Sequence, residues 1–455
     1  MNSCRWGTKY RVLFLIAITL CSLTLFHWTM RPLPLSPLDQ RLVGERDVIR
    51  SFQTIELDTM DLVAHKNGWV GFQDLKAVDC TSTLTATSVD NSQYPQSVPR
   101  VTDAQIEQDA AADCPNFNRK YGFQRYPEVT EEESDFPLAF IILFYKDLDQ
   151  ILFLLRAIYR PQNAYCLSVD LHSPPAFIDA VKAVTRCLPN VFLASKLEYV
   201  VYSGFTRLMS DIHCMRDLVK HPVPWKYVIN MPGQQFPLRT NLEMVQILKL
   251  YRGANDIEGM TGKRLLHKRF RLKHRYQYDG KTGRQKIVRT GQRNPPPPHN
   301  LMVVKGSAYG TYSRAFVDFA LNSPVSRDLL EWANVIESPD EYFWATLNHA
   351  TGLKVPGGYT EGPPDQKQWV TTFASWDAEN PCATKRVRWI CIFSTADLPM
   401  LLSRQELFAN KFYITHHPAA LHCLDQMLYN MTVTGMVRDL DYYRKLKFVK
   451  RHTEA

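Results

Sequence analysis

The central part of the chain alternates short apolar runs with segments of helical spacing. Residues 137–144 form an uninterrupted apolar run of strand length, and 164–169, 191–194 and 225–231 are further predicted strands. Runs of this kind are typical of parallel strands that are buried on both faces. The segments with helical spacing are 147–159, 176–184, 194–218 and 241–251. The alternation predicts an α/β domain with a Rossmann-like half.

A different apolar pattern lies near the N-terminus. Residues 12–28 contain no charge and no helix breaker, and Arg5, Lys9 and Arg11 precede them. No small-residue cleavage site follows the run, so the pattern favours an uncleaved signal anchor with a single span, and the cations are expected to hold the N-terminus in the cytosol. A cleaved signal peptide is the alternative. The expected order is a cytosolic tail at 1–11, a membrane helix at 12–30, a Pro-rich stem at 31–78 and a luminal domain at 79–455.

Composition adds the compartment and the charge. The chain has 455 residues, ten cysteines and a net charge of +9. Eight of the cysteines follow the apolar N-terminal segment, where an oxidising lumen would allow them to pair. In the same compartment, the sequon at Asn430 could be glycosylated. Much of the positive charge lies between residues 259 and 300, which we interpret as a solvated face, since nucleic acid is not expected in the lumen.

Residues 338–347, SPDEYFWATL, admit two interpretations. Ser338 can cap a helix, Pro339 fits its first turn, and Asp340 and Glu341 suit the positive end of the helix dipole. The segment is then an ordinary helix start. The other interpretation is an active-site carboxylate, and neighbouring residues on a helix point about 100° apart, so only one of the two acids could face a substrate.

Several blocks in a fixed order resemble one enzyme family. They are LLRAIYRPQNAYCLSVD (154–170), NVFLASKLEYVVYSGFTRL (190–208), CMRDL (214–218), WKYVIN (225–230), FPLRTNLE (236–243), KGSAY (305–309), SPDEYFWATL (338–347) and LFANKF (407–412). Together they resemble the core 2 and I-branching β-1,6-N-acetylglucosaminyltransferases of glycosyltransferase family 14. The resemblance implies a GT-A glycosyltransferase fold, a Golgi type II membrane protein, UDP-GlcNAc as the donor and a glycoprotein glycan as the acceptor.

The resemblance also implies roles for individual residues. Glu341 corresponds to the catalytic base, which an inverting displacement needs in order to take the proton of the attacking hydroxyl. Arg388 and Lys411 correspond to the cations that replace a metal on the diphosphate, and Asp170 would meet the nucleotide at a strand end. No metal cofactor is therefore expected. Two DxD strings, at 147–149 and 439–441, are interpreted as a helix start and a surface segment.

The implied acceptor residues come from a second set of matches. They are Glu258, Lys268, Arg271 and Trp376. The two cations match the family pattern only after an insertion of two residues. An exposed indole stacks well on the apolar face of a sugar, although Trp376 could equally be a core residue. The implied disulfides are Cys80–Cys423, Cys114–Cys187, Cys166–Cys214 and Cys382–Cys391, a choice that the sequence alone cannot make among 105 connectivities.

Three departures from the family pattern keep other functions open. Ala378 stands where the core 2 type has Tyr, and the connection from Trp376 to Cys382 is shorter. Pro232-Gly233-Gln234-Gln235 stands where the family has Cys-Gly-x-Asp, so a free thiol and an acidic residue are both gone. The first interpretation is an active transferase. The second is a weakly active or inactive protein that keeps the sugar-nucleotide site, and the third is a purely structural membrane-anchored protein.

Overall fold

A computed structural model describes residues 69–376 and 382–451 of the chain. Its centre is a five-stranded sheet in the order β3-β2-β1-β4-β8. The strands are β1 (Leu138–Phe144), β2 (Ala164–Val169), β3 (Val191–Leu193), β4 (Tyr227–Pro232) and β8 (Thr311–Ser313). The first four are parallel and β8 is antiparallel to β4. The four predicted segments therefore form strands; β1, β2 and β4 are almost entirely buried, whereas β3 is only partly buried.

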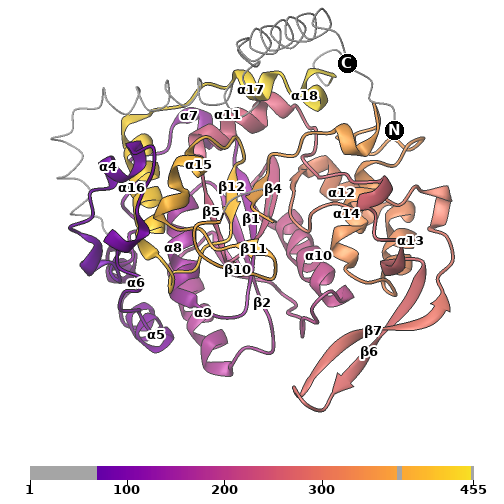
Figure 1. Cartoon of the computed structure of the whole chain (residues 1–455), viewed down its shortest axis with the longest axis horizontal. Helices are drawn as coiled ribbons and strands as arrows, with labels where there is room; N and C mark the ends of the chain where they lie inside the picture. The colour runs from indigo at the N-terminus through magenta and orange to yellow at the C-terminus, as the bar shows by residue number, and fades with distance from the viewer. Residues whose placement is uncertain (1–68, 377–381, 452–455) are drawn as a thin grey trace, which may run out of the picture. The chain divides into compact units, whose positions relative to one another are not determined.

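Helices cover both faces of this sheet. Figure 1 shows α8 (Leu148–Ile158) and α9 (Pro175–Cys187) on one side, and α10 (Phe205–Lys220), α12 (Arg314–Asn322) and α14 (Phe343–Asn348) on the other. The α/β alternation is confirmed. The prediction of a helix from residue 194 was wrong at its start, because α10 begins only after Gly204, and Ser203 before it has a left-handed φ of 60°.

A smaller sheet and two hairpins complete the strands. The small sheet has the order β5-β12-β9, from Gln235–Pro237, Phe408–Asn410 and Thr372–Ala374. One hairpin is β10 (Arg386–Val387) with β11 (Ile390–Cys391), and the other is β6 (Leu272–Asp279) with β7 (Arg284–Arg293). The second hairpin occupies the basic segment, where the sequence pattern predicts no strands.

The remaining helices surround these sheets. They are α4 (Cys80–Thr85), α5 (Asp103–Ala112), α6 (Cys114–Lys120), α7 (Glu131–Ser134), α11 (Asn241–Tyr251), α13 (Pro324–Ala333), α15 (Leu398–Leu402), α16 (Pro418–Thr434), α17 (Asp441–Arg444) and α18 (Lys447–Arg451). Within the described residues, no helix is both long and apolar enough to cross a bilayer. The expected span at 12–30 lies outside those residues.

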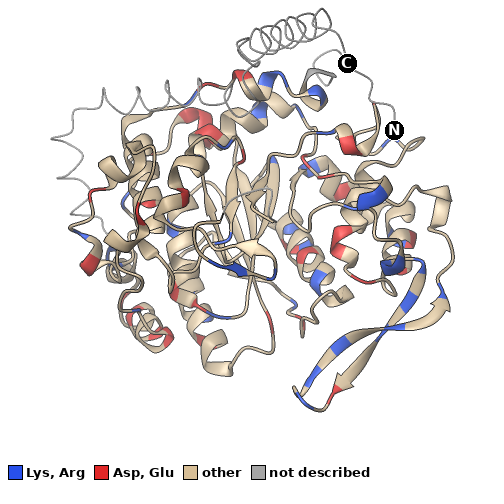
Figure 2. Ribbon diagram, viewed as in Figure 1, with Lys and Arg blue, Asp and Glu red and all other residues tan. Residues whose placement is uncertain are grey.

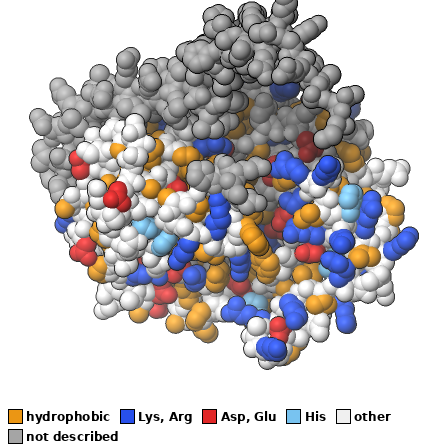
Figure 3. Space-filling view, viewed as in Figure 1, with side chains coloured by type: hydrophobic (Ala, Val, Ile, Leu, Met, Phe, Trp, Pro, Cys, Tyr) orange, Lys and Arg blue, Asp and Glu red, His pale blue; other side chains and the backbone are white. Residues whose placement is uncertain are grey.

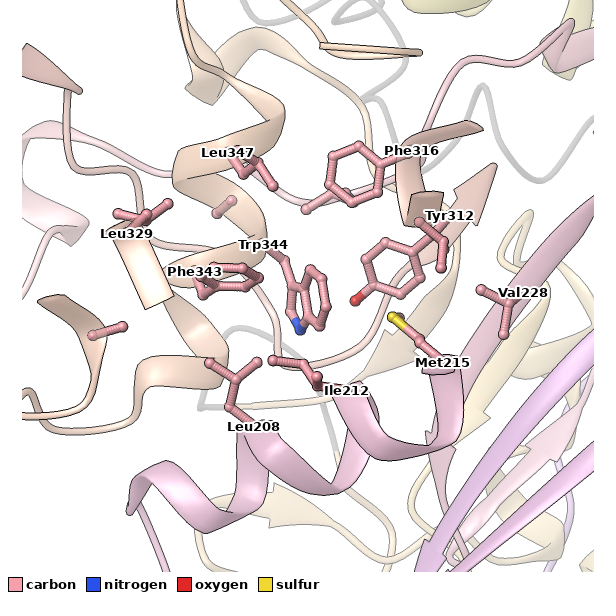
Figure 4. Close-up of a cluster of buried hydrophobic side chains, with 14 of the residues drawn as sticks. Leu208, Ile212, Met215, Val228, Tyr312, Phe316, Leu329, Phe343, Trp344 and Leu347 are labelled. Atoms are coloured by element: carbon pink, nitrogen blue, oxygen red, sulfur yellow. The ribbon is translucent and has the colours of Figure 1, made fainter. Parts of the chain in front are cut away.

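One large core cluster lies between the sheet and α10, α12 and α14. Trp344 and Phe343 of α14 are fully buried there beside Tyr312 and Ile212, as Figure 4 shows. Two large aromatic rings on a six-residue helix anchor it firmly, because each buries a large apolar surface. The turn that precedes α14 is thereby held in place.

Four disulfides join distant parts of the chain. They are Cys80–Cys423, Cys114–Cys187, Cys166–Cys214 and Cys382–Cys391, the pairs that the resemblance implies. Near the first of them, Trp69 and Phe72, from the last ten residues of the expected stem, pack against Phe153 of α8. The described part of the chain therefore belongs to the folded body from its first residue, Trp69.

The sequon residue Asn430 lies inside α16 and is only 7% exposed. An oligosaccharide needs an exposed attachment point, usually on a loop. The structure thus disfavours glycosylation at Asn430, which the sequence pattern could not reveal.

Candidate active site

Glu341 ends a one-turn 3₁₀ helix, Pro339–Glu341, that leads into α14. Ser338 does not cap this turn: its φ is 54° and its side chain makes no capping bond. Its backbone N–H instead donates to the carbonyl of Ser203, over 2.7 Å. The expectation of a Ser-capped helix start was therefore wrong, and the acidic pair sits on a turn fixed by tertiary contacts.

Two cations hold the carboxylate of Glu341. The Nη1 atom of Arg269 and the Nζ atom of Lys305 each lie 2.9 Å from its Oε2 atom. The side chain of Glu341 remains 26% exposed. Charge-assisted bonds of this kind fix the orientation of a carboxylate. We did not expect either cation from the sequence, although Lys305 directly precedes GSAY and Arg269 lies within HKRFR.

Gly306 explains how Lys305 reaches this position. Its N–H donates to the carbonyl of Glu341 over 2.7 Å. A Cβ atom at Gly306 would lie only 2.4 Å from the carbonyl oxygen of Glu258. Only glycine allows the two segments to approach so closely. The GSAY glycine therefore packs the Lys305 segment against the base turn on one side and Glu258 on the other.

Asp340 is buried, whereas Glu341 is only partly buried. Its carboxylate lies 4.0 Å from Arg207 of α10, which also pairs with Asp211. Burial raises the pKa of Asp340 to about 6, and Arg207 opposes that shift. The two acids of the motif thus occupy different surroundings, and the Glu341 side chain is the more exposed, at 26% against 10% for Asp340.

The raised pKa of Asp340 predicts a pH-dependent effect on stability. The folded protein binds this proton more tightly than the unfolded chain, whose ordinary value is 3.8. The stabilisation is therefore present below pH 4 and is lost as the pH rises through about 6. Asp340→Asn stays neutral, so we expect it to gain about 1 to 3 kcal/mol relative to the native protein between pH 4 and pH 7.5.

Denaturant midpoints at the two pH values measure this difference. Asp179→Asn is the matched control, because the Asp179 side chain is 54% exposed. The control should show no such change. An equal pH dependence in native protein and Asp340→Asn would contradict the prediction.

Two further cations lie together on the C-terminal part of the chain. Arg388 is exposed on the β10–β11 turn, and Lys411 follows β12 and is 9% exposed. Burial lowers the pKa of Lys411, and the charge of Arg388 lowers it further. Among the described residues, no carboxylate lies within 4 Å of either side chain. Two adjacent cations without a counterion favour the binding of an anion.

A single loop connects this cation pair with the base turn. The guanidinium of Arg388 lies 4.6 Å from the centre of the Tyr202 ring. The next residue, Ser203, accepts the bond from Ser338 at the start of the base turn. The loop before α10 thus brings together two segments that are about fifty residues apart in the sequence.

Asp170 follows β2 at the carboxyl end of the parallel sheet, where nucleotides bind in folds of this type. Its Oδ1 atom accepts bonds from the N–H of Val200 (3.1 Å) and the N–H of His172 (2.9 Å). The side chain therefore also braces the segment that leads to Tyr202.

The four expected acceptor residues are not equally close to Glu341. Glu258 lies beside the Lys305 segment, and burial raises its pKa, which Lys305 and Arg264 oppose. Lys268 and Arg271 are exposed on either side of Arg269, which is the cation that contacts the base. Trp376 is 56% exposed, so it is not a core residue. Ala378 lies outside the described residues.

The first DxD string is engaged by another part of the chain. Arg100 bonds Asp147 over 2.8 Å and also pairs with Asp149, which is 1% exposed at the start of α8. Asp439 and Asp441 are exposed near the C-terminus, and Asp441 pairs with Arg444. The described residues contain no group of three or more acidic, His or Cys side chains arranged for a metal ion.

A cavity of about 500 Å³ lies elsewhere. It is lined by Trp225, Tyr227 and Arg314 among others, near the amino ends of β1 and β4. Because Asp170 marks the opposite, carboxyl edge of the sheet, this cavity is not part of the site around Glu341.

Comparison with known proteins places this geometry in context. Residues 138–402 match the family model described as Core-2/I-Branching enzyme. The chain is 41% identical over 311 residues to a mouse protein named N-acetyllactosaminide beta-1,6-N-acetylglucosaminyl-transferase, covering 67% of this chain and 76% of the mouse protein. It is 38% identical over 336 residues to a sheep protein named beta-1,3-galactosyl-O-glycosyl-glycoprotein beta-1,6-N-acetylglucosaminyltransferase 3, covering 71% and 74%. The human protein of the latter name is 37% identical over 336 residues, covering 71% and 75%.

Proposed function

The chain belongs to the Core-2/I-Branching enzyme family, and from that premise we propose that it transfers N-acetylglucosamine from UDP-GlcNAc, in β-1,6 linkage, to galactose or N-acetylgalactosamine of a glycan. The observation that carries this proposal is that one loop contacts both the turn of Glu341, through Ser203, and the cation pair Arg388 and Lys411, through Tyr202. The GT-A fold is part of the proposal and agrees with the mixed sheet.

Glu341 is proposed as the general base. An α-linked donor that gives a β-linked product requires inversion, so a single in-line displacement is sufficient. Among the described residues, Arg269 and Lys305 both bond Oε2, and no donor bonds Oε1. Oε1 is then the oxygen that takes the proton of the attacking 6-hydroxyl, while the two cations keep the carboxylate aligned.

Arg388 and Lys411 are proposed to bind the diphosphate. As the bond from C1 to oxygen breaks, UDP gains negative charge that fixed cations stabilise. Arg can bond two phosphate oxygens and remains charged, whereas Lys411 acts as a point charge at the edge of the buried region. Asp170 is proposed to contact the nucleotide on the same edge of the sheet.

The acceptor is proposed to lie between Glu341 and four other side chains. They are Glu258, Lys268, Arg271 and Trp376. The exposed indole of Trp376 suits stacking on a sugar ring, and the carboxylate of Glu258 can accept hydrogen bonds from sugar hydroxyls. We further propose a Golgi type II protein with its anchor at residues 12–30.

A second candidate function is a sugar-nucleotide-binding protein with little or no activity. The observation that favours it is Gln235, which is 1% exposed and whose side-chain amide has no hydrogen-bond partner among the described residues. The resemblance has an acidic residue at this place. Its neighbour across the strands is Asn410, directly before Lys411, so the change adjoins the proposed donor site.

A transfer assay distinguishes the two functions. The purified protein is incubated with UDP-GlcNAc and a panel of core 1 and lactosamine acceptors, and the linkage of the product is determined. A β-1,6-linked product supports the transferase. Binding of UDP without turnover on any acceptor would favour the second function, and no binding of UDP would contradict both.

We expect transfer to be independent of divalent metal. Arg388 and Lys411 supply the positive charge at the diphosphate, and Arg100 occupies the first DxD string. Turnover in the presence of EDTA should therefore stay within about twofold of its value with manganese. A metal-dependent reaction would instead lose several kcal/mol of transition-state stabilisation when EDTA removes the metal. A loss of turnover in EDTA that manganese restores would contradict this prediction.

A further inference from the structure

The β6–β7 hairpin carries most of the excess charge of the chain. Residues 272–293 contain seven Lys or Arg residues and one acidic residue, which accounts for six of the nine net positive charges. Figure 2 shows the cations along both strands of this projecting hairpin, and Figure 3 shows Lys and Arg crowded on the same side of the molecule. The charge is therefore local rather than spread over the surface.

The strand register divides the hairpin into two faces. Tyr276 lies on the face that contacts the body, where its hydroxyl accepts the N–H of Phe205 over 2.8 Å. The pairs Arg275–Val288, Gln277–Lys286 and Asp279–Arg284 place their side chains on the opposite face. Arg275, Arg284 and Lys286 are all exposed there. The outer face thus presents a strip of cations to solvent.

One carboxylate, Asp279, lies on the same face as the three cations and neutralises one of them. Among the described residues, Lys286–Asp279, at 3.2 Å, is the only ion pair within 4 Å that involves a Lys or Arg of the hairpin. Alternate residues of a strand are about 7 Å apart, which is less than the screening length of about 8 Å at physiological salt. The cations therefore repel one another. Charged side chains on an exposed strand also prevent it from pairing with another chain. Charges of either sign would serve that purpose, so it does not explain an excess of positive charge.

We propose that the outer face of the β6–β7 hairpin binds a sulfated polysaccharide. A row of closely spaced cations matches a polymer with an anion on successive sugars, and Arg bonds sulfate oxygens through two N–H groups. The four disulfides indicate an oxidising compartment, which contains sulfated glycans but no nucleic acid. Membranes concentrate acidic lipid on the cytosolic leaflet, which the hairpin would not meet.

Immobilised heparin is the probe that tests this site. The full-length protein should bind heparin at about 0.1 M salt and be released as the salt rises, because the attraction is screened. A triple variant replaces the three outer-face cations Arg275, Arg284 and Lys286 with Gln. Each Lys or Arg near an anionic surface contributes roughly fivefold to the affinity, so the loss of three should weaken binding roughly 100-fold.

The matched control removes the same charge elsewhere. Lys76, Lys182 and Arg216 are exposed cations outside the hairpin, and their replacement by Gln should change heparin binding less than about threefold. Equal losses in the two triple variants would overturn the inference, as would a native protein that does not bind heparin. Binding to phosphatidylserine vesicles or duplex DNA as tight as that to heparin would also overturn it.

Discussion

Glu341→Gln is expected to reduce turnover by roughly 10²- to 10⁴-fold while UDP affinity barely changes. The amide keeps the shape of the side chain but cannot accept the proton of the acceptor hydroxyl. The carboxylate is the exposed member of the acidic pair, and its partners Arg269 and Lys305 remain in place to hold the substituted side chain. Initial rates on the best acceptor of the panel and UDP binding by calorimetry measure the two quantities.

Glu337→Gln is the matched control for this prediction. Glu337 also pairs with Arg269, at 3.5 Å, and its side chain is 27% exposed, close to the 26% of Glu341. We expect this variant to keep turnover within severalfold of the native value. If Glu341 only completes a helix start, Glu341→Gln should cost about 0.3 to 1 kcal/mol of stability and leave turnover intact. That result would remove the proposed base.

The second large effect is expected at the cation pair. Arg388→Met and Lys411→Met should each reduce turnover by roughly 10²- to 10³-fold, since each removes a fixed charge that stabilises the leaving diphosphate. UDP affinity should fall as well, because the product carries the same diphosphate. Arg388→Lys restores the charge but not the two-pronged bonding, so its turnover should lie between the native value and that of Arg388→Met.

Lys385→Met is the control for the cation pair, because Lys385 is an exposed cation three residues before Arg388. It should leave both turnover and UDP affinity within about twofold, as expected for a surface charge. If Arg388→Met and Lys411→Met behave like this control, another group must neutralise the diphosphate. A recovery of the two variants by manganese would point to a metal in that role.

The periodicity of the sequence predicts the central sheet well but the loops badly. The apolar runs are long enough to identify β1, β2 and β4, since strands buried on both faces need apolar residues throughout. The segment 195–204 also contains apolar residues, but it is a loop. Its conformation is held by contacts with Asp170, Ser338 and Arg388. No local pattern contains those partners.

The basic segment is a second part of the chain whose structure the sequence pattern does not predict. Its charge suggests a solvated surface, and it is one, but among the described strands β6 and β7 pair only with each other, and His274 is their only buried residue, so the sequence shows no clear alternation. The short connection at Gly280 and Gly283 is compatible with a hairpin, yet a pair of glycines among cations is a weak signal.

By itself, the sequence determined the α/β class, the family and the acidic pair that includes Glu341, because these depend on residue order and on buried strands. Only the tertiary structure decided that Asp340 faces Arg207 while Glu341 faces Arg269 and Lys305. It also decided that Arg388 and the turn of Glu341 contact the same loop, Arg388 at Tyr202 and the turn at Ser203. These contacts join residues far apart in the chain, and their partners are selected by how helices pack on the sheet, which local propensity does not encode.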